Sequence, residues 1–225
     1  MKRRTPVAAP RYAHLFWDLD GTLTDSRDGM LRSVAFALER LGVQADAETL
    51  ERFLGPPLVR SFRGLCGLEG EALSRAVALY RDRYLRVGWL ENRLVPGIED
   101  LLRDLAGAGV AMTLVTVKPR PTAERILEHF DLGRYFAAVS APARYGLAAD
   151  KADLLAEAMG GGPWSDPGRS AMIGDHEDDM RAARLAGIDG IAVLYGYGNR
   201  QALLAARPVA VAGDACALRR LLLPG

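Results

Sequence analysis

The chain has 225 residues, of which 49% are hydrophobic and 25% charged, and both fractions are ordinary for a folded globular protein. This length predicts one domain, or one core that carries an insertion, and it is enough to bury a core without disulfide or metal staples. The net charge of +1 excludes a protein whose overall charge draws it to nucleic acid or to an anionic membrane.

The number and spacing of the cysteines and the absence of long apolar runs indicate the cellular compartment of the protein. Cys66 and Cys216 are far apart in the sequence and match neither a disulfide framework nor a zinc spacing, which favours a reducing compartment. The N-terminal segment lacks the apolar centre of an export signal, and no segment reaches the ~18 apolar residues of a membrane span. We therefore expect a cytoplasmic protein with no nucleic-acid or membrane partner and no evident obligate protein partner.

The N-terminal part of the chain predicts one strand followed by a block of helices. The apolar run His14–Asp18 is typical of a buried strand, and the acidic and glycine residues after it indicate a turn. Between about residues 25 and 92, apolar side chains recur at helical spacing, as at Val34, Leu38 and Leu41. No strand is expected in this block, which should be all helical.

From Pro96 onward, helical and strand-like segments alternate. Helices are expected near 98–108, after Pro119, from about Lys151 and over 179–186, and strands near 110–115, 135–139, 170–173, 191–194 and 209–211. Such alternation predicts an α/β fold with a doubly wound, mainly parallel, Rossmann-like sheet. Residues 1–23 and 95–225 would form this core, and residues 24–94 would be an all-helical insertion after the first strand.

Polar side chains follow three of the expected strands, at the edge of a parallel sheet where ligands bind. The first strand is followed by Asp18 and Asp20, the second by Thr116, Val117 and Lys118, and the 170–173 strand by Asp175 and Asp179. Lys151 begins a helix between them. Only three of the 29 basic residues are lysines. The compact ammonium of Lys151 is suited to contact with a phosphate. Lys118 could also contact the phosphate, or it could lie in a solvated loop.

This set of side chains predicts a site for a cation and a phosphoryl group. Asp18, Asp20 and Asp175, brought within a few ångströms of one another, would raise one another's pKa values. A divalent cation relieves that repulsion, and carboxylate oxygens are ligands that suit Mg²⁺. A hydroxyl and an ammonium beside the cation could neutralise the oxygens of a phosphoryl group. Asp175 could also cap the helix that follows it.

The two-residue spacing of Asp18 and Asp20 places both carboxylates on one side of an extended segment. One carboxylate could be a nucleophile that becomes phosphorylated, and the other could protonate the leaving oxygen and then activate water. Gly21 lets the backbone pass close to the phosphate, whose oxygens nearby amides could bind.

Four short motifs, in this order along the chain, resemble those of the haloacid dehalogenase-like superfamily of phosphohydrolases. They are DxDGT at Asp18–Thr22, a threonine after an apolar strand at Thr116, a lysine at Lys151, and GDxxxD at Gly174–Asp179. DxD alone would be a weak signal, whereas four motifs in the right order are a strong one. The helical block resembles the small cap that this family inserts between its first and second motifs.

The resemblance implies a role for each matching residue. Asp18 would be the nucleophile, Asp20 the general acid and base, and Thr116 and Lys151 the binders of the transferring phosphoryl group. Mg²⁺ would be held by Asp18, the backbone carbonyl of Asp20, and Asp175. Asp179 would orient Lys151 or metal-bound water.

Further features resemble the phosphoglycolate phosphatase branch, namely DGTLTDS, LGPPLVRSF, VKP after Thr116, and VLYGYG. This branch implies a small phosphorylated metabolite as substrate, with 2-phosphoglycolate as the first expectation. Arg60 or Arg63 in the helical block could pair with the carboxylate of such a substrate. Related enzymes act on nucleotides or pyrophosphate, and a phosphomutase also remains open.

Other functions fit the pattern less well. A halide-removing hydrolase of the same fold would have no use for Asp20, because a halide leaves without a proton. A receiver-like phosphoacceptor module carries no helical insertion and places its acceptor on an internal strand. A dinucleotide-binding dehydrogenase would need G-x-G-x-x-G after a strand, which the sequence does not supply.

Overall fold

The computed structural model describes residues 10–145, 149–160 and 166–223, and the chain forms two compact units. One unit combines the chain up to Leu23 with the chain from Leu94 onward, and the other is Thr24–Arg93. No helix among the described residues has the length and apolar character needed to cross a lipid bilayer.

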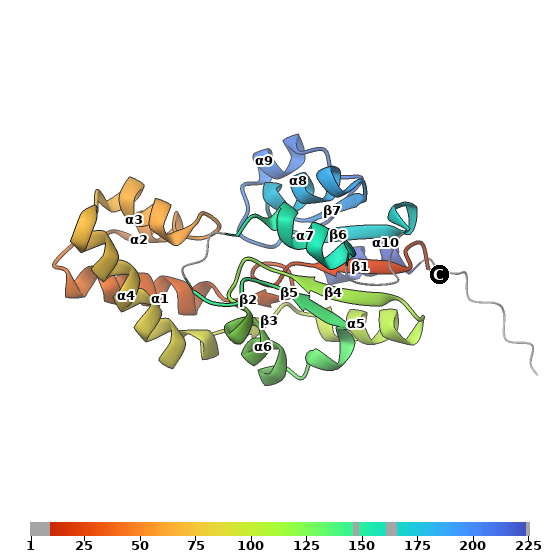
Figure 1. The fold of residues 1–225 in the computed structure, drawn as a ribbon, viewed down its shortest axis with the longest axis horizontal. Coiled ribbons are helices and arrows are strands. Elements are labelled where there is room, and N and C mark those ends of the chain that lie inside the picture. The colour runs from red at the N-terminus through yellow and green to blue at the C-terminus, as the bar shows by residue number, and fades with distance from the viewer. Residues whose placement is uncertain (1–9, 146–148, 161–165, 224–225) are drawn as a thin grey trace, which may run out of the picture. The chain divides into compact units, whose positions relative to one another are not determined.

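The first unit is built on a six-stranded sheet with the strand order β5-β4-β1-β6-β7-β8 (Figure 1). The strands are β1 (His14–Trp17), β4 (Ala111–Val115), β5 (Ala138–Ser140), β6 (Ser170–Gly174), β7 (Asp189–Val193) and β8 (Ala210–Ala212). Every neighbouring pair runs parallel. The expected doubly wound parallel sheet is confirmed.

In the part of the chain that the structure describes, six α-helices accompany this sheet. They are α5 (Ile98–Gly107), α6 (Arg120–His129), α7 (Lys151–Gly160), α8 (Glu177–Ala186), α9 (Arg200–Ala205) and α10 (Ala215–Leu222), with short 3-10 turns at Gly133–Tyr135 and Pro167–Arg169. Helices α7, α8 and α9 lie on one side of the sheet, and α5 and α6 lie on the other (Figure 1). Helix α10 packs against α5, and α7 packs against α8.

Strand β1 lies at the centre of the sheet, and its apolar sequence follows from that position. All four of its residues are buried, because β4 and β6 flank it and helices cover the sheet. Phe16 of β1 belongs to the same buried cluster as Leu155 of α7 and Ala183 of α8. The burial of this strand positions the residue that follows it, Asp18, at the carboxyl edge of the sheet.

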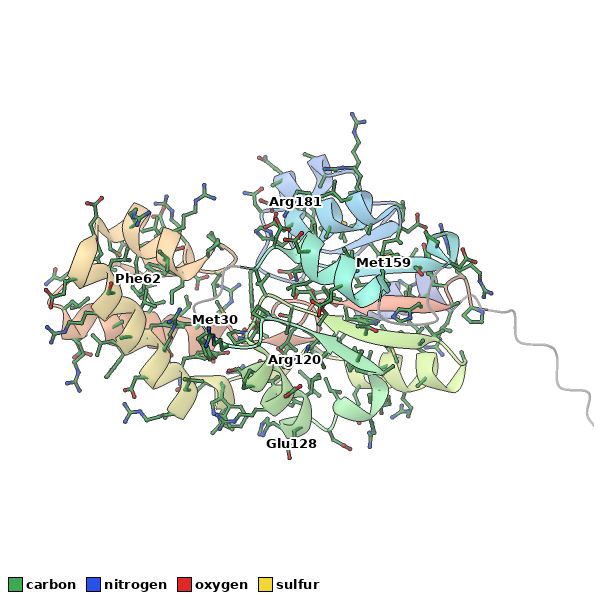
Figure 2. The ribbon with its side chains drawn as sticks, in the orientation of Figure 1. Met30, Phe62, Arg120, Glu128, Met159 and Arg181 are labelled. Atoms are coloured by element: carbon green, nitrogen blue, oxygen red, sulfur yellow. The ribbon has the colours of Figure 1, made fainter. Side chains whose placement is uncertain are left out.

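The second unit is helical, as expected. It contains α1 (Arg27–Arg40), α2 (Ala47–Glu51), α3 (Leu58–Cys66), α4 (Gly70–Arg86) and a 3-10 turn at Gly88–Leu90. Its own core gathers Phe62, which Figure 2 labels, with Val34, Leu38 and Tyr80. Two-residue strands, β2 (Thr24–Asp25) and β3 (Arg93–Leu94), pair where the chain enters and leaves this unit. Such short strands have no sequence period, so they were not expected.

Several element boundaries differ from the expectation by one to three residues, and two of them have a clear structural reason. Strand β5 begins at Ala138, because Tyr135 ends a 3-10 turn. Helix α8 begins at Glu177 rather than at Asp179. His176 occupies its N-cap position: its ring accepts from the Asp178 amide, while the Asp179 carboxylate accepts from the His176 amide.

Candidate active site

Three neighbouring strands deliver the predicted site residues to one edge of the sheet. Trp17, the last residue of β1, is in register with Leu114 of β4 and with Ile173 of β6. Asp18 follows β1 directly, and its amide donates to the carbonyl oxygen of Ile173 at 3.0 Å. Because parallel strands share a carboxyl edge, the residues after β4 and β6 end beside Asp18.

Lys151 lies at the centre of the site. Its Nζ is 2.6 Å from Oδ1 of Asp18 and 2.9 Å from Oδ1 of Asp179, and it donates to the carbonyl oxygen of Val115 at 3.3 Å. Two ion pairs and a hydrogen bond surround the ammonium, which explains how a lysine that is only 5% exposed is tolerated. The neighbouring carboxylates raise the pKa of Lys151 despite its burial, so it stays charged.

The start of helix α7, where Lys151 lies, is itself anchored. Asp150 accepts two hydrogen bonds from Nη2 of Arg181, at 2.7 and 2.9 Å. Arg181 lies on α8, the helix that packs against α7 (Figure 2). This contact joins the helix that carries Lys151 to the helix that carries Asp179.

Asp179 is fully buried in the first turn of α8. One of its oxygens meets Lys151, and the other accepts from the amide of His176 at 3.0 Å. A Cβ atom on Gly174 would lie 2.1 Å from Oδ2 of Asp179, so glycine is required there for space. Both oxygens of Asp179 are therefore engaged in holding the site together.

Asp175 is buried and held by three donors. Oδ1 accepts from the hydroxyl of Thr22 at 3.2 Å, and Oδ2 accepts from the amides of Tyr197 at 2.7 Å and Gly198 at 3.2 Å. The alternative that Asp175 caps helix α8 is wrong, because His176 occupies that position.

Asp18, Asp175 and Asp179 form a buried carboxylate cluster in which one oxygen from each lies within 4.8 Å of the others. Burial raises the pKa of Asp18 to about 8 and that of Asp175 to about 6, and neighbouring carboxylates act in the same direction. Three carboxylates face one ammonium, so the ionised cluster carries an excess of two negative charges. Hard oxygen donors with that excess fit a divalent cation such as Mg²⁺.

The side chain of Asp20 is not in this cluster. It forms an ion pair with Lys118, with 2.9 Å between Oδ2 and Nζ, and the amide of Lys118 donates to Oγ1 of Thr116 at 3.2 Å. Thr116 is buried, whereas the neighbouring Val117 is half exposed. The second motif therefore links the predicted phosphoryl-binding hydroxyl to the predicted acid and base.

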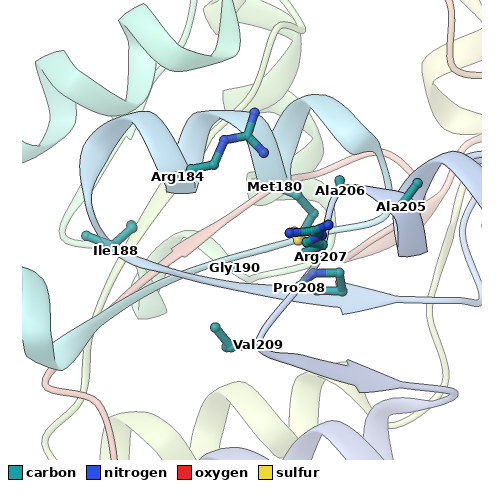
Figure 3. A pocket seen from close by; sticks show the side chains of 9 residues that line it. All are labelled: Met180, Arg184, Ile188, Gly190, Ala205, Ala206, Arg207, Pro208 and Val209. Carbon is teal, nitrogen blue, oxygen red and sulfur yellow. The ribbon is translucent and has the colours of Figure 1, made fainter.

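The remaining predicted site residues lie in different places. Gly21 adopts a φ of +82° beside Asp175, a conformation that favours glycine. Arg60 is exposed on α3, in the helical unit, and its role toward a substrate stays a prediction. A separate surface pocket of about 600 Å³ lies on the core between α8, α9 and the start of β7, and none of the predicted site residues lines it (Figure 3).

Sequence reasoning missed the contribution of the loop after β7. Tyr197 and Gly198 act through their backbone amides, so the contact does not depend on a particular side chain and cannot be seen in the sequence. The signal that could have found the loop is its glycine spacing, since Gly196 and Gly198 both stand against Asp175.

The model of the haloacid dehalogenase-like hydrolase family matches residues 15–193, which include all four motifs. The chain belongs to this family. The resemblance inferred from the motifs is thus confirmed, and so is the expectation of an enzyme whose relatives include phosphatases.

Individual relatives carry different names. A 5'-nucleotidase of Pseudomonas aeruginosa is 38% identical over 220 residues, which cover 96% of this chain and 97% of that protein. The tyrosine-protein kinase PtkA of Mycobacterium tuberculosis is 38% identical over 187 residues, 82% of this chain and 63% of the kinase. A phosphoglycolate phosphatase of Pseudomonas putida is 31% identical over 234 residues, 98% of this chain and 81% of that protein.

Among solved structures, a haloacid dehalogenase-like hydrolase of Streptococcus pneumoniae matches with a TM-score of 0.84 and 32% identity. The match covers 92% of this chain and 97% of that one. Sequence and fold therefore agree on the family.

Proposed function

We propose that the chain is a Mg²⁺-dependent phosphomonoester hydrolase that forms a phosphoaspartate at Asp18. The observation that carries the proposal is the buried ammonium of Lys151 between Asp18 and Asp179, in one cluster with Asp175. Residues so distant in sequence meet only because the fold brings them to one edge of the sheet. A buried cluster with excess negative charge and one fixed cation suits the binding of Mg²⁺ and a phosphoryl group.

In the first step, a carboxylate oxygen of Asp18 attacks phosphorus and the bond between phosphorus and the leaving oxygen breaks. Lys151 orients Asp18 through Oδ1, and its charge stabilises the phosphoryl oxygens together with the hydroxyl of Thr116. Asp20 gives its proton to the leaving oxygen, so the alcohol departs neutral. Asp20 enters this step as the carboxylic acid and leaves it as the carboxylate, and Lys118 positions its side chain for the transfer.

In the second step, Asp20 takes a proton from water, whose oxygen attacks phosphorus. The bond between phosphorus and Asp18 breaks, and inorganic phosphate is released with Asp18 restored as a carboxylate. Asp179 keeps Lys151 in place throughout both steps.

Asp18, Asp175 and the backbone carbonyl of Asp20 would hold Mg²⁺. The chemistry that bound Mg²⁺ supplies is charge neutralisation of the phosphoryl oxygens. The fit rests on the donors themselves, which are hard oxygens in a cluster with more carboxylates than cations.

We propose a small phosphorylated metabolite as the substrate, with the helical unit as a cap that selects the leaving group. The first candidate substrate is an acidic ester such as 2-phosphoglycolate. The phosphoglycolate phosphatase relative and the exposed Arg60 and Arg63 on α3 support it. A nucleoside 5'-monophosphate is the second candidate, because the 5'-nucleotidase relative is more similar and covers nearly the whole chain.

The test is phosphate release by the purified protein from 2-phosphoglycolate, nucleoside 5'-monophosphates, pyrophosphate and p-nitrophenyl phosphate. Each is assayed with Mg²⁺ and with EDTA, for the wild type and for Asp18→Asn. We expect Mg²⁺-dependent release of phosphate from at least one monoester, no release in EDTA, and no turnover by Asp18→Asn. Full turnover in metal-free buffer contradicts the role of Mg²⁺, and turnover by Asp18→Asn contradicts the role of Asp18.

A further inference from the structure

The loop Tyr195–Gly198 follows β7 and closes over the carboxylate of Asp175. The amides of Tyr197 and Gly198 both donate to Oδ2 of Asp175, at 2.7 and 3.2 Å. Two amides on one oxygen fix the rotation of this carboxylate more firmly than a single donor does. None of the four motifs includes this loop.

Glycine at positions 196 and 198 is required for space. A Cβ atom on Gly196 would lie 2.3 Å from both Cβ and Oδ2 of Asp175, and one on Gly198 would lie 1.8 Å from the carbonyl oxygen of Asp175. Neither glycine has a positive φ, so backbone freedom is not the reason for it. Gly21, in a different loop, also meets Asp175, and a Cβ there would lie 2.4 Å from Oδ2. Asp175 is thus enclosed by glycines from two separate loops.

Tyr195 ties these two loops together. Its hydroxyl donates to the carbonyl oxygen of Thr22 at 3.0 Å, and the hydroxyl of Thr22 donates to Oδ1 of Asp175 at 3.2 Å. Burial raises the pKa of Tyr195, so the phenol keeps the proton that it donates. The contacts run from Tyr195 to Thr22, from Thr22 to Asp175 and from Asp175 to Tyr197. The backbone of the loop joins Tyr197 to Tyr195 and closes this ring.

We propose that the Tyr195–Gly198 loop is the positioning element that presets Asp175 for a divalent cation and thereby sets the affinity for Mg²⁺. The inference rests on the proposed function, in which Asp175 is a ligand of Mg²⁺. Groups that orient a metal ligand typically change metal affinity by about 10- to 100-fold when they are removed. The loop acts on the cation through Asp175 and contributes no side chain to the reaction.

Isothermal titration of the full chain with MgCl₂ alone tests this proposal. Gly196→Ala should weaken Mg²⁺ binding by about 10- to 100-fold, since the added methyl displaces the carboxylate of Asp175. Tyr195→Phe, which removes only the hydroxyl, should weaken it by up to about tenfold on the same scale. The matched control is Gly213→Ala, because nothing lies within 4 Å of a Cβ at Gly213. It should bind as the wild type does.

Thermal unfolding with and without MgCl₂ separates positioning from folding. A purely structural role lowers the melting temperature in EDTA and leaves the increase that Mg²⁺ causes unchanged, whereas the proposal predicts a smaller increase. Wild-type affinity in a folded Gly196→Ala overturns the proposal. If Gly196→Ala does not fold, wild-type affinity in Tyr195→Phe overturns it. A wild type that binds no Mg²⁺ refutes the metal part of the proposed function, and this inference with it.

Discussion

Nζ of Lys118 lies 2.9 Å from Oδ2 of Asp20, and the exposed fractions of the two side chains are only 9% and 22%. The amide of the same lysine donates to Thr116. One residue thus connects the proposed acid and base to the proposed phosphoryl-binding hydroxyl. Ion pairs this far from solvent are weakly screened, so this pair holds the Asp20 carboxylate in one place.

Replacing Lys118 by methionine should mimic part of the loss of Asp20. General acid–base catalysis contributes a factor of about 10²–10⁴ to the rate. If Asp20 is no longer held in position, the rate on an alkyl ester such as 2-phosphoglycolate should fall about tenfold. The loss on p-nitrophenyl phosphate should be smaller, because that leaving group needs little protonation. Steady-state rates on both esters check this, with Lys118→Arg expected to recover activity in part. Equal losses on both esters would mean that Lys118 does not act through Asp20.

Lys151→Arg should be far more harmful than an exchange of one cation for another suggests. The ammonium meets three acceptors at 2.6 to 3.3 Å in a buried site, and a planar guanidinium cannot reproduce that geometry. Loss of one such electrostatic contact costs about 10²–10³ in kcat. A folded variant with kcat within about twofold of the wild type would remove Lys151 from the mechanism. The exposed Arg219→Lys serves as the control.

His14 should make the fold sensitive to acid. Its side chain is buried beside Thr113, with 2.9 Å between Nε2 and Oγ1, and burial lowers the pKa of His14 to about 4. In the unfolded chain His14 has an ordinary pKa of ~6.5. Between about pH 6.5 and pH 4 it is therefore protonated in the unfolded chain and neutral in the folded one. The contribution of His14 to the free energy of unfolding therefore falls as the pH drops from about 6.5 to about 4, and the loss is about 2 kcal/mol at pH 5. The raised pKa values of Asp18 and Asp175 act in the opposite direction over this range.

Urea unfolding at pH 7 and pH 5 checks the prediction for His14. His14→Gln keeps a polar group near Thr113 but cannot titrate. The unfolding free energy at pH 7 minus that at pH 5 should be about 2 kcal/mol smaller for this variant than for the wild type. The same pH dependence in both proteins would show that the acid sensitivity has another source.

Arg60→Ala and Arg63→Ala test the choice of substrate. Both arginines are exposed on α3, and a guanidinium can bind a substrate carboxylate through two hydrogen bonds. Each variant should lose more kcat/KM on 2-phosphoglycolate than on p-nitrophenyl phosphate, whose leaving group has no carboxylate. Parallel losses on the two esters, or no hydrolysis of 2-phosphoglycolate by the wild type, would refute the arginine contact. The proposal for Asp18 would survive that result.

Residues that follow buried strands were predictable from sequence. Asp18, Thr116 and Asp175 each come after an apolar run, and parallel strands deliver their carboxyl ends to one edge. Lys151 was predictable because this chain uses arginine almost everywhere else. The resemblance left open whether Asp179 would orient Lys151 or metal-bound water, and the structure shows a contact with Lys151 at 2.9 Å.

Other features of the site depend on details that the sequence does not carry. The partner of Lys118 remained open, because a long flexible side chain can reach several groups, and the structure pairs it with Asp20. The start of α8 was misplaced because a histidine fills the N-cap, where serine or aspartate is usual. The amides that hold Asp175 belong to the backbone of Tyr197 and Gly198, so no side-chain pattern records them.

Trapping the phosphoenzyme tests the central claim most directly. Asp20→Asn should be mixed with p-nitrophenyl phosphate and Mg²⁺, quenched in acid, digested and analysed by mass spectrometry. This ester needs little help in leaving, while the loss of the base slows attack by water, so the covalent intermediate should accumulate. We predict one phosphoryl group on the peptide that contains Asp18, and none when Asp18 is also changed to asparagine. Phosphate release without any phosphorylated Asp18, or a phosphoryl group on another residue, would contradict the account.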